Sequence, residues 1–157
     1  MTKPDAGYEL SITRTFDAPV DIVFGIWADR EHMIKWWGPK DFVTNSLELD
    51  FRVGGAYRAC IVHKDRESWM SGRFVEIETN RRIVFTFAWE GDADSIGNET
   101  LITITFSEAD GKTTQTFHQT PFRDADRRDS HVRGWTEVIN REQGYAECMA
   151  KNQGTKP

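Results

Sequence analysis

The chain has 157 residues, a length that favours one domain over 1–157, with enough interior for a hydrophobic core. Hydrophobic residues make up 38% and charged residues 29% of the sequence, which excludes an intrinsically disordered protein. The formal net charge of −5, without a basic stripe, argues against a nucleic-acid partner. We therefore expect a single globular domain with an ordered core over about 8–150.

The first forty residues predict a strand and two short helices. Residues 8–16 alternate apolar and polar side chains, as a half-buried strand does. A first helix follows Pro19, because apolar residues recur there at the spacing of one helical face: Val20, Val23, Phe24 and Trp27. A second helix begins at Asp29 and ends at Gly38-Pro39, and its apolar face carries Met33, Trp36 and Trp37.

The middle of the chain changes to a period of two, which predicts six further strands. Their expected ranges are 41–50, 55–64, 68–78, 81–89, 99–108 and 112–120. Short breaks with turn residues separate most of them, so neighbouring strands are expected to pair antiparallel. The longest break, 91–98, is polar and predicts a loop.

The last third of the chain predicts one long helix over 124–150. Its amphipathic stripe has the spacing of a single helical face and consists of His131, Trp135, Val138, Glu142, Tyr145 and Met149. The order of elements predicts an α+β fold, in which a seven-stranded antiparallel sheet curves around this helix. A pocket is expected in the space between the sheet and the helix.

Segments spread along the chain, in order, are similar to one known superfamily. They are 16–19 (FDAP), 36–39 (WWGP), 50–58 (DFRVGGAYR), 72–77 (GRFVEI), 82–87 (RIVFTF), 89–90 (WE), 99–101 (ETL), His131 and 134–135 (GW). Together they resemble the START-like SRPBCC superfamily. Within it, the chain looks most like the family named for the C-terminal domain of the activator of the 90-kDa heat-shock-protein ATPase.

The resemblance implies a helix-grip (START/Bet v-like) fold with a cavity between the sheet and the C-terminal helix. Members of the superfamily include lipid carriers, hormone receptors, aromatase/cyclases and chaperone activators. The eukaryotic chaperone activator carries an additional N-terminal domain that this sequence lacks, so chaperone activation is not the function that we expect first. Function has to be argued from the site rather than from the fold.

Aromatic side chains are the candidate ligand-binding residues. Trp, Phe and Tyr together make up 12% of the chain. Phe85, Phe87 and Trp89 share one face of a strand, where they either form the floor of a cavity or pack as an aromatic core. The full predicted lining consists of Trp36, Trp37, Trp69, Phe85, Phe87, Trp89, His131, Trp135 and Val138.

Glu142 and His131 are the candidate general acids or bases. Glu142 interrupts the apolar stripe at a position where the resembled family usually has leucine. It lies either in the pocket or, as we favour, at an exposed edge of the helix. His131 is either a polar group on the pocket wall or, as we favour, a core histidine whose hydrogen bonds are satisfied.

Metal and cofactor chemistry has no support in the sequence. The four histidines form no ligand pair, Cys60 and Cys148 fit no metal or redox spacing, and no nucleotide-binding motif occurs. We expect neither a metal nor a cofactor. The N-terminal segment has no apolar signal region, which predicts a cytoplasmic protein without membrane insertion.

Three functions fit these features. The first is binding of a small hydrophobic molecule, aromatic compounds included, without catalysis. The second is a cyclase or isomerase that uses Glu142 or a histidine as general acid or base. The third is a protein-interaction module, either a chaperone cofactor or a homodimer, which requires an exposed apolar patch.

Overall fold

The computed structural model describes residues 8–91 and 99–154, and residues 92–98 of the expected polar loop lie outside this part of the chain. The elements follow the expected order. They are β1 (Tyr8–Phe16), α1 (Val20–Ala28), α2 (Arg30–Trp36), β2 (Val43–Leu49), β3 (Ala56–His63), β4 (Arg66–Glu78), β5 (Arg82–Trp89), β6 (Thr100–Ala109), β7 (Lys112–Phe122) and α3 (Ala125–Gly154).

The strands form one antiparallel sheet in the order β1-β7-β6-β5-β4-β3-β2. From β2 to β7 each strand pairs with the next along the chain, as the short connections predict. The expected strand 41–50 begins only at Val43, because Asp41 has a φ of 72° that breaks the extended backbone. The last strand continues two residues beyond 120, to Phe122.

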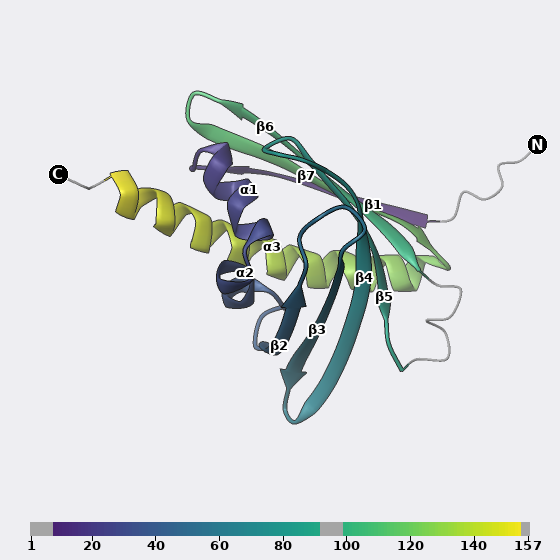
Figure 1. Ribbon diagram of the computed structural model, residues 1–157. Coiled ribbons are helices and arrows are strands. Elements are labelled where there is room, and N and C mark those ends of the chain that lie inside the picture. Colours follow the sequence, from purple (N-terminus) through teal and green to yellow (C-terminus); the bar gives the residue numbers. More distant parts are fainter. Residues whose placement is uncertain (1–7, 92–98, 155–157) are drawn as a thin grey trace, which may run out of the picture.

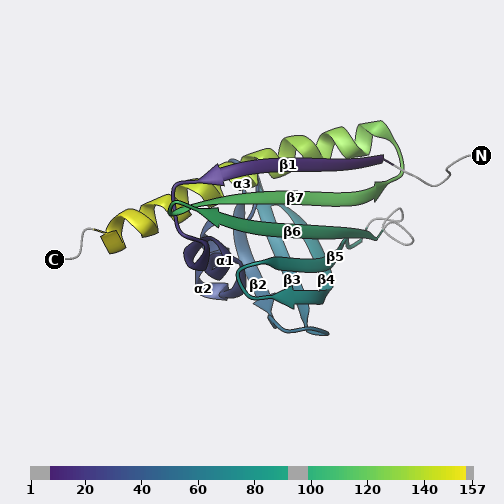
Figure 2. The ribbon, with the colours of Figure 1, turned by 90° about the horizontal axis from the view of Figure 1, so that it is seen from above.

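Helix α3 packs along the sheet beside β1 and β7 and also contacts α1 and α2 (Figures 1 and 2). Its buried face contains Trp135, Val138, Glu142 and Ala146, which belong to the predicted face or lie next to it. The architecture is the expected α+β helix-grip fold. No helix in the described part of the chain is long and apolar enough to cross a membrane.

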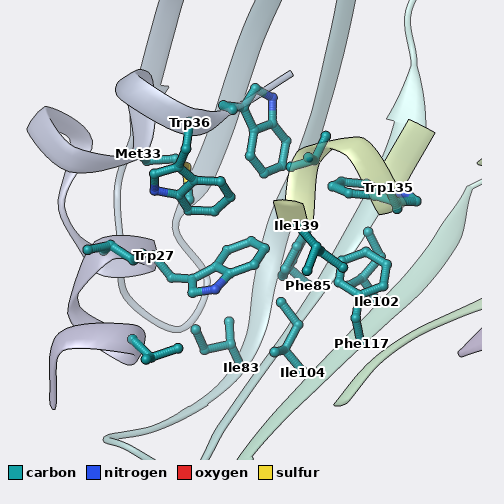
Figure 3. Packing of buried hydrophobic residues seen from close by; sticks show 14 of the residues in the cluster. Trp27, Met33, Trp36, Ile83, Phe85, Ile102, Ile104, Phe117, Trp135 and Ile139 are labelled. Atoms are coloured by element: carbon teal, nitrogen blue, oxygen red, sulfur yellow. The ribbon is translucent and has the colours of Figure 1, made fainter. Parts of the chain in front are cut away.

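The core is rich in rings, and Trp27 of α1 lies near its centre (Figure 3). Its indole packs edge-on against Trp36, with ring centroids 4.8 Å apart, and against Trp37 at 6.1 Å. Such edge-to-face pairs place the positive ring edge of one residue against the negative face of the other. These ring contacts join α1 to α2 and to Trp37, which directly follows α2.

Candidate ligand-binding cavity

A cavity of about 320 Å³ lies between α3 and the concave face of the sheet. Its walls come from strands β3, β4 and β5, from the first half of α3, and from segment 37–42, which follows α2. Six residues of the predicted lining are on these walls: Trp37, Phe87, Trp89, His131, Trp135 and Val138. Their contact with a ligand remains a prediction.

Edge-to-face ring contacts hold the aromatic wall together. Phe87 has its ring centroid 5.4 Å from that of Trp89 and 5.7 Å from that of Trp135. Trp135 in turn lies 5.5 Å from Trp37. Each ring is therefore positioned by the next, and the wall is built before any ligand arrives.

The three tryptophans of this wall have their indole N–H groups bound by the protein itself. Trp37 Nε1 donates to Met70 Sδ at 3.3 Å. Trp89 Nε1 donates to His131 Nε2 at 3.1 Å, and Trp135 Nε1 donates to Gln119 Oε1 at 2.7 Å. With their polar atoms paired, these side chains present the cavity with apolar ring surface.

Two other residues of the predicted lining lie in the core instead of the cavity wall. Trp36 has no exposed surface and packs against Trp27 and Trp37. Phe85 is on the same face of β5 as Phe87 but deeper, in contact with Trp27, Tyr57 and Phe74. On β5, therefore, Phe87 and Trp89 line the cavity, whereas Phe85 belongs to the aromatic core.

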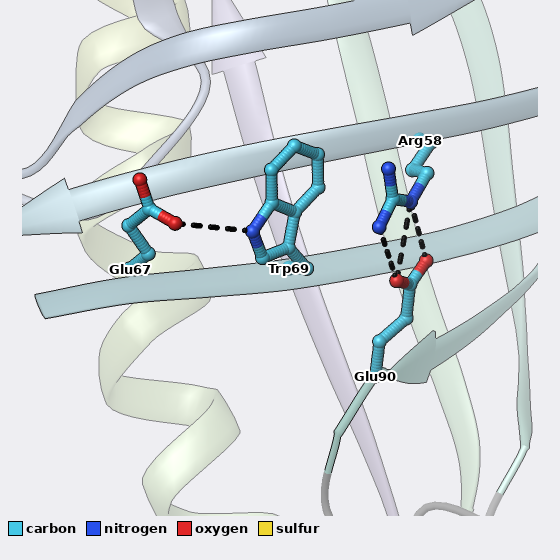
Figure 4. Close-up of polar contacts among 4 residues, drawn as sticks. All are labelled: Arg58, Glu67, Trp69 and Glu90. Carbon is cyan, nitrogen blue, oxygen red and sulfur yellow. Dashed lines mark hydrogen bonds and ion pairs between the residues drawn. The ribbon is translucent and has the colours of Figure 1, made fainter.

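Trp69, also predicted to line the cavity, lies on the opposite, outer face of the sheet. Its neighbours Ser68 and Met70 line the cavity, so the alternation of the strand turns Trp69 outward. There the guanidinium of Arg58 stacks over its ring at 4.0 Å, while Glu67 accepts its indole N–H (Figure 4). Arg58 also forms an ion pair with Glu90 at 2.8 Å.

Sequence reasoning missed several lining residues, most of them small or on the loop. They are Gly38, Pro39, Phe42, Ile61, Ser68, Met70, Ser130 and Gly134. Gly38 has a φ of 103°, a conformation that glycine adopts readily, and it lets the chain turn from α2 across the cavity. The available signals were the alternation of β4 for Ser68 and Met70, and the helical spacing of Ser130 and Gly134 beside Trp135.

His131 is the predicted acid–base candidate that lies on the cavity wall. Both of its ring nitrogens have partners: Nε2 accepts from Trp89, and Nδ1 donates to the carbonyl oxygen of Arg127 at 2.9 Å. This pattern requires the neutral ring with the proton on Nδ1. Burial lowers the pKa of His131, which favours the same neutral form.

Glu142 is completely buried, which corrects the expectation that it lies at an exposed edge of the helix. Its Oε2 accepts the indole N–H of Trp27 at 2.8 Å, and its Oε1 accepts an N–H of Gln115 at 3.0 Å. Burial raises the pKa of Glu142 to about 8, although both hydrogen bonds act in the opposite direction. It is not among the residues that line the cavity.

The cavity wall offers little polar chemistry. Among residues 8–91 and 99–154, those that line it include no aspartate, glutamate, lysine or arginine, and their hydroxyl groups are those of Ser68 and Ser130. Among the described residues, no group of three or more His, Cys, Asp and Glu side chains could hold a metal ion. The arrangement can enclose an apolar molecule, but it supplies no charged group to one.

A family model described as "Activator of Hsp90 ATPase homolog 1-like protein" matches residues 17–146 of the sequence. The chain belongs to this family. The AHSA1-like family is part of the START/SRPBCC superfamily, as the sequence motifs indicate. The superfamily commonly binds hydrophobic ligands. A comparison with curated proteins gives no match.

Solved structures of bacterial proteins share the AHSA1-like fold. A protein of Chromobacterium violaceum is 26% identical, with a TM-score of 0.80 over 88% of this chain and 96% of that chain. A protein of Staphylococcus epidermidis is 25% identical, with a TM-score of 0.72 over 100% and 97%. An AHSA1 protein of Silicibacter pomeroyi is 21% identical, with a TM-score of 0.77 over 87% and 96%, and shows the fold alone.

Proposed function

We propose that this protein binds a small, uncharged aromatic molecule in the cavity between α3 and the sheet. The observation that carries the proposal is the hydrogen bonding of the three tryptophans that line the cavity. Their indole N–H groups are bound by Met70, His131 and Gln119, so the rings face the cavity as apolar surface. Flat rings that meet a flat ligand gain both burial and edge or face contacts.

The size of the cavity favours a compact ligand. Its volume of about 320 Å³ is at the lower end of the range of about 300–1,000 Å³ that is typical of small-molecule sites. A compound of one or two fused rings suits such a volume better than a lipid with a long chain. We therefore propose a small planar ligand.

The lining residues that the structure describes carry no carboxylate, ammonium or guanidinium group, which favours an uncharged ligand. An ionised carboxylate that enters the cavity loses its hydration, and the described part of the lining offers no lysine or arginine to replace it. The hydroxyls of Ser68 and Ser130 can still bond to one polar atom of a neutral ligand. A phenol-type compound fits this combination.

Isothermal titration with two matched probes, 2-naphthol and 2-naphthoate, tests the proposal. At pH 7 the first is neutral and the second is an anion, while the ring system is the same. We expect 2-naphthol to bind at least about tenfold more tightly, the ratio that corresponds to about 1.4 kcal/mol. Equal affinities would contradict the charge argument, and no binding of either probe would contradict the proposed function.

A pair of glycine variants shows where the probe binds. Gly134 of α3 lines the cavity, and a Cβ there would lie 3.9 Å from Pro39, whereas a Cβ at Gly144 meets nothing within 4 Å. Gly134→Leu fills space at the cavity and should abolish binding of 2-naphthol. Gly144→Leu, the matched control in the same helix, should bind as the wild type does.

A further inference from the structure

Segment 37–42 forms one side of the cavity and contributes Trp37, Gly38, Pro39 and Phe42 to its lining. It has no regular secondary structure that would hold it in place. Pro39 reaches across to α3, where its Cγ lies 3.9 Å from the position of a Cβ on Gly134. What fixes this segment therefore also fixes its distance from α3 beside the cavity.

Arg141 of α3 holds the segment through its backbone. Its guanidinium lies within hydrogen-bonding distance of several carbonyl oxygens, and the shortest contact joins Nη1 to Gly38 at 2.7 Å. Nη1 also lies 3.3 Å from the oxygens of Pro39 and Phe42. Hydrogen bonds from a charged donor are stronger than neutral ones, and a planar guanidinium can serve several acceptors at once.

Glu137, one helical turn before Arg141, holds the same segment as a hydrogen-bond acceptor, whereas Arg141 is a donor. Its Oε1 accepts the backbone N–H of Lys40 at 3.1 Å. Thus α3 presents an acceptor and a donor at positions i and i+4, one for an N–H and one for the carbonyls of one short segment. Neither of the two side chains lines the cavity.

We propose that Glu137 and Arg141 are positioning residues, which hold segment 37–42 against α3 at one side of the cavity and limit the escape of a bound ligand. The inference rests on the proposed function, because it assigns to these residues the control of ligand exchange at the same site. Releasing either contact lets Pro39 and Phe42 move away from α3. A bound molecule then leaves faster.

Two measurements on the full chain test whether Glu137 and Arg141 hold segment 37–42 in this way. Hydrogen exchange of the ligand-free protein reports how firmly residues 37–42 are held, and stopped-flow displacement gives the dissociation rate constant of 2-naphthol. In Arg141→Met we expect faster exchange confined to this segment and a dissociation rate constant raised about tenfold. Arg141→Lys should recover part of both, since one ammonium replaces part of the guanidinium contacts.

Glu137→Ala is the second variant, which should fold even if Arg141→Met does not. Glu137 is exposed, so its removal leaves the interior untouched. We expect the same changes as in Arg141→Met, but smaller. Arg133→Ala removes another exposed residue of α3 outside the lining and should leave both measurements as in the wild type.

The two proposals fail in different ways. Faster exchange of 37–42 with an unchanged dissociation rate constant would overturn the positioning role alone, because the segment would then be held without controlling the ligand. Unchanged exchange in both Arg141→Met and Glu137→Ala would overturn it as well. A wild-type protein that does not bind 2-naphthol would overturn the proposed function, and this inference with it.

Discussion

The indole N–H of Trp27 donates to Oε2 of Glu142 across 2.8 Å in the interior of the protein, joining α1 to α3. Gln115 of β7 donates to the other oxygen and also accepts from Trp27 at 3.2 Å. A carboxyl group is thereby enclosed by an aromatic core, where it accepts hydrogen bonds from two N–H donors. Its charge state affects the stability of the whole fold, because all three elements meet at this group.

The pKa of Glu142 predicts a pH-dependent stability. Its carboxyl has a pKa of about 8 in the folded protein against the usual 4.5, so the folded state holds the extra proton between these values. The free energy of unfolding therefore falls as the pH rises through this window, by up to about 1.4 kcal/mol per pH unit. Urea denaturation at pH 5, 6, 7 and 8 measures this slope.

Glu142→Gln provides the comparison, since its neutral amide replaces the protonated acid. Rotation of the Gln115 amide lets the new side chain donate to Gln115 while it still accepts from Trp27. We expect this variant to lose the decline with pH and to be more stable than the wild type at pH 8. The lowered pKa of His131 acts in the opposite direction below about pH 6.5, equally in both proteins. Parallel pH profiles would refute the role of Glu142.

The hydrogen bond between Trp89 and His131 predicts that the pKa of His131 changes when its donor is removed. A protonated His131 cannot accept the indole N–H at Nε2, so this bond favours the neutral ring. Trp89→Phe removes the donor and should raise the pKa of His131, while burial continues to lower it. NMR titration of the imidazole measures it. Trp69→Phe, on the outer face, should leave this pKa unchanged, and a shift as large as that of Trp89→Phe would disprove the assignment.

The position of Trp69 on the outer face of the sheet predicts that the two cysteine thiols differ in reactivity. Cys60 is buried and lies directly opposite Trp69 on the neighbouring strand, whereas Cys148 is exposed. Burial also raises the pKa of the Cys60 thiol, which lowers its reactivity further. Ellman's reagent should modify only Cys148 in the native protein, and both thiols in Trp69→Ala. A second thiol that stays unreactive in this variant would show that Trp69 does not cover Cys60.

Gly134 and Gly144, in the interior of α3, predict equal gains in stability when each is replaced by alanine. An alanine inside a helix is more favourable than glycine by about 1 kcal/mol, and a Cβ fits without a close contact at either Gly134 or Gly144. Both Gly134→Ala and Gly144→Ala should therefore raise the free energy of unfolding by about 0.5–1 kcal/mol in urea titrations. A loss of stability at Gly134 alone would mean that Pro39 has no room for the methyl group.

The fold could be predicted because each element carries its own period in the sequence. The face of Trp69 could not, since a shift of one residue in the alternation of β4 turns every side chain to the other side of the sheet. The favoured placement of Glu142 failed for a different reason. Its partners Trp27 and Gln115 lie 115 and 27 residues away along the chain, so the hydrogen bonds that permit its burial are invisible in the local pattern.

The walls of the cavity come from distant parts of the polypeptide. Trp37 packs against Trp135, and segment 37–42 is held by Glu137 and Arg141 near the other end of the chain. During synthesis on a ribosome, which proceeds from the N-terminus, the seven strands emerge before α3. The cavity is not complete at that stage, because α3 supplies one of its walls. The proposed binding of a ligand therefore has to wait until α3 has been made.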